Sequence, residues 1–87
     1  MRFKKNPYLE ATLLEVVEKQ LTHRDPPEVK ETYDRLLSEG FSDEESRRLI
    51  GAALVNEVYT IMKERQPFNH ARYVAALHKL PKLPWEE

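Results

Sequence analysis

The chain has 87 residues, 40% of them hydrophobic and 33% charged, with a formal net charge of −1 and no cysteine. That length fits one domain, residues 1–87, and the near-neutral charge excludes a strong general attraction to nucleic acid or anionic membranes. Without cysteine there is no disulfide and no thiolate metal site, so a hydrophobic core must stabilise the fold alone. No apolar run has the length of a membrane helix or follows the basic start as in a signal peptide. We expect a cytoplasmic protein without a cofactor.

The first predicted helix begins at an asparagine–proline pair. Asn6 is typical of an N-cap, and Pro7 fits the first helical position, where its missing N–H group has no partner to lose. Apolar residues then recur at helical spacing, at Leu9, Leu13, Val16, Val17 and Leu21. This pattern predicts a helix over about 7–22, preceded by a short basic arm over residues 1–5.

The second predicted helix lies between a pair of prolines and a glycine. Asp25 precedes the two prolines and predicts an N-cap for a helix over about 26–39. Gly40 ends this helix, because a residue without Cβ adopts the left-handed turn at little cost. Phe41 then folds back onto Leu36, the apolar contact that commonly accompanies such a turn.

Two more helices follow, each with its own N-cap. Ser42, with a glutamate three positions later, predicts a capping box and a long helix over about 42–66. Asn69 predicts the cap of a fourth helix over about 69–80, after which prolines leave an extended tail over 81–87. No segment alternates steadily between apolar and polar residues, so we predict an all-α bundle of four helices packed around the third.

The third helix carries most of the residues that we expect to contact a partner. Apolar side chains cover more than half of its circumference, which indicates either a central helix or one that shares a face with a second chain. The small residues 51–53 also predict a close approach by a neighbouring helix. Trp85, after two prolines, either folds back over the core or meets a partner. We expect a homodimer, or a complex with another protein, through Val55, Tyr59, Met62 and Trp85.

Most charged residues are spaced for ion pairs along one helix. Arg47 and Arg48 allow two interpretations, a phosphate-binding pair or a neutralised, solvated face, and the first would fit a helix–turn–helix made by the second and third helices. The acids Asp43, Glu44 and Glu45 precede both arginines, and they favour ion pairing and would repel a phosphate backbone. We therefore favour the neutralised face and do not expect nucleic-acid binding.

Two acids lie within apolar arcs of the predicted helices. Glu10 and Glu57 could face each other across the first and third helices and hold a metal ion or a proton. Alternatively, Glu10 lies at the rim and Glu57 bonds to an arginine or a tyrosine hydroxyl. We favour the second interpretation, because His23, His70 and His78 all lie elsewhere and none completes a metal set.

Several short runs carry a resemblance to a known type of protein: Asn6-Pro7-Tyr8-Leu9, Glu18-Lys19-Gln20-Leu21, Pro26-Pro27-Glu28-Val29, Gly40-Phe41, Pro67-Phe68 and Leu80-Pro81. Over about residues 6–81 the chain resembles small bacterial all-helical domains of unknown function. Many such domains carry histidines four apart on the first helix and more on the third, which implies metal binding. The corresponding positions here hold Glu10, Leu14, Glu44 and Arg48, so the resemblance implies the fold without the histidine site.

No serine, histidine or carboxylate set in the sequence has the spacing of a catalytic site, and no glycine-rich loop is present to bind phosphate. The sequence therefore predicts a non-catalytic helical protein that serves as a protein–protein interaction or accessory module. A metal-binding bundle that uses Glu10 and Glu57 is one alternative, and a helix–turn–helix nucleic-acid binder is the other.

Overall fold

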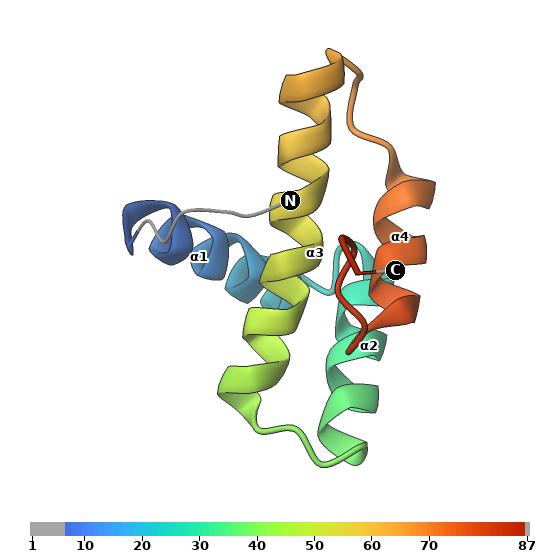
Figure 1. Ribbon diagram of the computed structural model, residues 1–87. Helices are drawn as coiled ribbons and strands as arrows, with labels where there is room; N and C mark the ends of the chain where they lie inside the picture. The colour runs from blue at the N-terminus through green and yellow to red at the C-terminus, as the bar shows by residue number, and fades with distance from the viewer. Residues whose placement is uncertain (1–6, 87) are drawn as a thin grey trace.

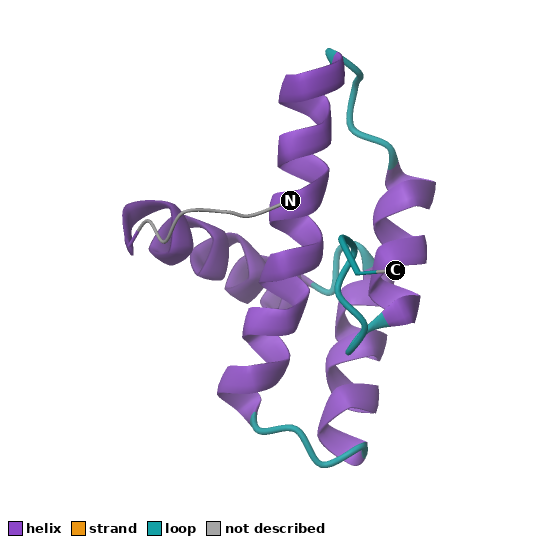
Figure 2. Ribbon diagram, viewed as in Figure 1, coloured by secondary structure: helices purple, strands orange, loops and turns teal. Residues whose placement is uncertain are grey.

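The structure, a computed structural model, describes residues 7–86, apart from the side chains of Pro7 and Leu9. It contains four helices in the order α1 (Pro7–His23), α2 (Pro27–Ser38), α3 (Asp43–Glu64) and α4 (His70–Lys79) (Figure 1). Within that range every regular element is a helix, so the predicted all-α fold is confirmed (Figure 2). The predicted basic arm and the predicted Asn6 cap lie outside the described residues.

The long helix α3 is the axis of the bundle and contacts each of the other three helices. Its 22 residues correspond to about 33 Å at 1.5 Å per residue, which matches the longest dimension of the molecule, 34 Å. In Figure 1, α2 lies along the first half of α3, α4 lies beside the middle of α3, and α1 crosses α3. The loop after α3 runs back beside the last turns of that helix to reach α4. The prediction that the bundle packs around the third helix is therefore confirmed.

The core forms where these four helices meet. Every helix contributes to it, and burying an aliphatic or aromatic side chain in this way contributes about 1.5–3 kcal/mol. Tyr73 is the largest of the fully buried side chains. The buried apolar residues are Val17, Val29, Leu36, Ile50, Ala53, Leu54, Tyr73, Leu77 and Leu80.

The end of α2 forms the glycine turn that the sequence predicts. Gly40 has a φ of +99°, and its N–H donates to the carbonyl of Leu37 at 3.1 Å. The N–H of Phe41 donates to the carbonyl of Leu36, also at 3.1 Å, which completes a Schellman motif. The Phe41 side chain is half-buried against the core, so this cap also fixes the direction in which the chain enters α3.

Two of the three N-caps that can be compared with the structure are confirmed. The Ser42 hydroxyl accepts from the N–H of Glu45, whose carboxylate accepts from the Ser42 N–H, which makes a complete capping box. Asn69 caps α4 through the N–H of Arg72 at 2.9 Å. The Asp25 cap is wrong: Pro26 occupies the N-cap position in an extended conformation, and it has no side-chain oxygen to accept a bond.

Two further expectations need correction. A Cβ added at Gly51 would have no heavy atom of another element within 4 Å, so no neighbour makes the predicted close approach to this glycine. The tail after α4 is not extended, because Lys82 N–H donates to the Lys79 carbonyl at 2.9 Å and Glu86 N–H donates to the Leu83 carbonyl at 3.0 Å. These two turns return the tail toward α4.

Candidate functional site

The carboxylate of Glu57 is buried inside the bundle, and Arg72 of α4 is its partner. The Glu57 side chain is only 2% exposed; Nε of Arg72 donates to its Oε1 and Nη2 to its Oε2, each at 2.7 Å. The N–H of Asn69 adds a third bond, to Oε2 at 2.9 Å. Hydrogen bonding to Arg72 lowers the pKa of Glu57, against the effect of burial, which raises it. The expectation that Glu57 bonds to an arginine or a tyrosine is therefore confirmed with an arginine.

Glu10, the second candidate acid, pairs with a different arginine. It is half-buried on α1 and accepts a hydrogen bond from Arg48 of α3, which also pairs with Glu44 at 3.2 Å. Positions 48 and 57 of α3 point to opposite faces, because nine steps of about 100° end half a turn away. The structure therefore does not bring Glu10 and Glu57 together. Between residues 7 and 86, no three His, Asp or Glu side chains are grouped so that they could hold a metal ion.

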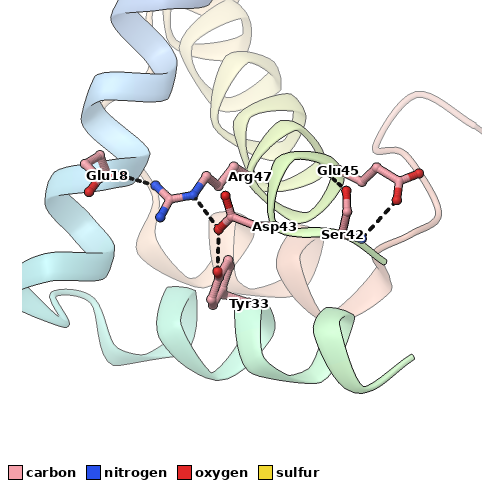
Figure 3. A network of polar contacts seen from close by, with 6 residues as sticks. All are labelled: Glu18, Tyr33, Ser42, Asp43, Glu45 and Arg47. Carbon is pink, nitrogen blue, oxygen red and sulfur yellow. Dashed lines mark hydrogen bonds and ion pairs between the residues drawn. The ribbon is translucent and has the colours of Figure 1, made fainter. Parts of the chain in front are cut away.

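Arg47 lies at the centre of a polar network that joins three helices (Figure 3). Its guanidinium pairs with Glu18 of α1 and, at 2.9 Å, with Asp43 one turn earlier on α3. The Tyr33 hydroxyl of α2 donates to the same Asp43 carboxylate, and the guanidinium carbon lies 5.7 Å from the centre of the Tyr33 ring. The hydrogen bond from the Tyr33 hydroxyl to the Asp43 carboxylate lowers the pKa of Asp43 and raises the pKa of Tyr33. The network links α1 and α2 to the first turn of α3.

The ion pairs that Arg47 and Arg48 make with carboxylates argue against the phosphate-binding interpretation. Arg47 contacts acids on α1 and α3, and Arg48 does the same. A phosphate at either guanidinium would have to replace a carboxylate already in place. The expected neutralised face is confirmed, and its long-range partners Glu10 and Glu18 are contacts that helical spacing alone could not indicate.

The predicted interaction residues Val55, Tyr59 and Met62 share one face of α3, as their spacing requires. Val55 and Tyr59 are half-buried, and the Lys63 ammonium lies 5.6 Å from the centre of the Tyr59 ring. The Met62 side chain is 75% exposed. We define these three residues as the α3 face.

Trp85 belongs to a different part of the molecule. It is half-buried in the tail, whose residues Pro84 and Glu86 line a cavity together with Arg72 and Lys79 of α4. Of the two expectations for the tryptophan, the structure favours the one in which the tail packs on its own domain.

The three histidines are dispersed and exposed. His23 is the last residue of α1, and His78 lies in the last turn of α4. His70, at the start of α4, lies with its Nε2 3.5 Å from Oε2 of Glu28 on α2. The other Glu28 oxygen is buried and has no hydrogen-bond partner among the described residues. This pair links the first turns of α2 and α4, and within residues 7–86 it belongs to no group of three His, Asp or Glu side chains that could hold a metal ion.

Comparisons with family models, with curated proteins and with solved structures found no match for this chain. The resemblance to small bacterial helical domains therefore stays a prediction. Among the helices of residues 7–86, none combines the length and the apolar character needed to cross a membrane.

Proposed function

We propose that this chain is a non-catalytic helical protein that works by binding another protein chain, and that a second copy of itself occupies the α3 face. The observation that carries the proposal lies at the end of α3. None of residues 58–64 is buried, although four of the seven are apolar, namely Val58, Tyr59, Ile61 and Met62. A single exposed apolar residue is common on a protein surface, but four apolar residues that are not fully buried at one helix end are typical of an interface that would bury them.

Charge supports a second copy as the partner. The net charge of the whole chain is −1, so two copies repel each other only weakly. The α3 face itself contains no charged residue, and the nearest charges at the helix end are Lys63 and Glu64, which have opposite signs. In a two-fold dimer the same face of both chains forms the interface, so each apolar residue of the α3 face is buried in both copies.

Sedimentation equilibrium at low micromolar concentration tests the proposal with two variants. Met62→Glu places a charge in the α3 face, and Leu37→Glu changes an exposed apolar residue of α2 in the same way as a matched control. We expect the wild type and Leu37→Glu to associate and Met62→Glu to sediment as a monomer of 10.3 kDa.

Two results would contradict the proposal. A monomeric wild type removes the second copy as the partner. Association that persists in Met62→Glu at wild-type strength shows that the contact lies on another surface of the chain.

A further inference from the structure

A cavity of about 210 Å³ that is open to solvent lies between α3, α4 and the returning tail. Four of its lining residues are exposed, namely Ala75, Lys79, Lys82 and Glu86. On the α4 side the lining contains the small side chains of Ala75 and Ala76, and on the tail side Leu83 and Pro84 form an apolar wall. The two tail turns described above hold these walls in place. The polar groups around the cavity belong to Asn56, Arg72, Lys79, Lys82 and Glu86.

The cavity carries an excess of one positive charge, because Glu57 neutralises Arg72 and the lining also holds two lysines, Lys79 and Lys82, and one acid, Glu86. Arg72 is fixed in direction, because its Nε and Nη2 donate to the buried Glu57 carboxylate. Its remaining nitrogen, Nη1, has no hydrogen-bond partner among the described residues, and Lys79 and Lys82 have no ion-pair partner there. A cation already held in place loses little conformational freedom when an anion binds.

We propose that this cavity binds a small carboxylate with an apolar body. Its volume is roughly seven times the ~30 Å³ that one water molecule occupies in the liquid, which leaves room for a small ligand with one ring and one carboxylate. The apolar body packs on Ala75, Leu83 and Pro84, and the carboxylate accepts hydrogen bonds from the cationic side. The site shares no residue with the α3 face, so this proposal does not depend on whether the chain self-associates.

Three probes of nearly the same shape separate charge recognition from apolar binding: benzoate, the neutral benzamide and the cationic benzamidine. The measurement is a titration of the ¹⁵N-labelled full chain at low salt, followed by ¹H–¹⁵N NMR. We expect benzoate to shift the amide signals of residues 72–86 saturably, and the other two probes to bind at least about tenfold more weakly. Acetate, which has the charge without the apolar body, is expected to bind more weakly than benzoate.

Variants place the site on the molecule. Lys79→Gln combined with Lys82→Gln removes two cations and is expected to weaken benzoate by about tenfold. Ala75→Leu fills the apolar side and is expected to abolish the saturable shifts. Lys19→Gln, on the exposed side of α1, is the matched control and should bind benzoate as the wild type does.

The proposal is overturned if benzoate produces no saturable shifts in the wild type, or if benzamide binds as tightly as benzoate. It is also overturned if the double lysine variant retains wild-type affinity. The probe comparison uses the unmodified chain, so it decides the question even if a variant fails to fold.

Discussion

Replacing Arg72 by methionine would leave Glu57 as a buried carboxylate without its cation. The variant keeps an apolar side chain of similar length but removes both 2.7 Å bonds to Glu57, so only the Asn69 N–H at 2.9 Å remains. A buried charge stripped of its partner destabilises a protein by about 3–5 kcal/mol. Small domains have total stabilities of about 5–15 kcal/mol, so this single change removes a large part of the margin.

Urea unfolding at neutral pH, followed by circular dichroism, measures the loss. With a denaturant slope of about 1–3 kcal/mol per molar, the midpoint should fall by roughly 2 M. Arg48→Met is the matched control, because that side chain is 53% exposed and its ion pairs lie at the surface. Exposed ion pairs contribute about 0.2–1 kcal/mol, so the control should unfold close to the wild type.

The pH dependence of the same variant provides a second check. Because hydrogen bonding to Arg72 lowers the pKa of Glu57 below its usual 4.5, the pair stabilises the fold fully above that pH. The stabilisation is lost as the pH falls through the lowered pKa. The difference in unfolding free energy between the wild type and Arg72→Met should therefore be largest near neutral pH and narrow in acid.

The double variant Glu57→Met with Arg72→Met separates loss of a pair from exposure of a bare charge. Replacing both members by apolar side chains is often neutral or stabilising, so we expect it to unfold at higher urea than Arg72→Met alone. The reasoning is refuted if Arg72→Met costs no more than Arg48→Met, or if the double variant is the less stable of the two.

Two further predictions concern stability. Gly51→Ala should raise the free energy of unfolding by about 0.8–1 kcal/mol, measured by urea unfolding, because the added Cβ enters open space and alanine favours the helix; a destabilised variant would contradict this. Burial raises the pKa of Tyr73 to about 12 from 10.0, so the folded state keeps its proton where the unfolded chain has lost it. Stability should therefore fall by about 1.4 kcal/mol per pH unit between those values, and Tyr73→Phe should remove most of that slope in alkaline unfolding curves.

The features that the sequence predicts well are those controlled by a few neighbouring residues. Gly40 has to adopt a positive φ and Ser42 has to meet an N–H three residues later, and both requirements are visible in the local sequence. The helix bounds follow from such signals and agree with the structure within two residues at each end. The Asp25 cap fails because two consecutive prolines leave two possible starts, and propensity alone does not decide between them.

The candidate site depends on contacts between segments far apart in the chain, which helical spacing does not reveal. Glu57 and Arg72 are fifteen residues apart in the sequence, and Glu18 and Arg47 are twenty-nine residues apart. The sequence carries one indication of the contact between Glu57 and Arg72. Arg72 comes three residues after the Asn69 cap, and this spacing places it in the first turn of α4. No sequence pattern indicates the cavity, because it forms only where the tail turns back toward α4, whereas the prolines predict an extended tail.

The lengths of the helices explain why the end of α3 lacks buried residues. α2 and α4, of 12 and 10 residues, lie on one side of α3 and are joined where Arg35 Nη2 donates to the Leu77 carbonyl at 3.1 Å. On another side α1 crosses α3, and its ion pairs reach Arg47 and Arg48 in the first two turns. A helix about 10 Å wide covers only about a third of the 33 Å of α3 where it crosses. A partner helix beside α1 would therefore find Met62 within reach, and this geometry is why the variant Met62→Glu is the decisive one for self-association.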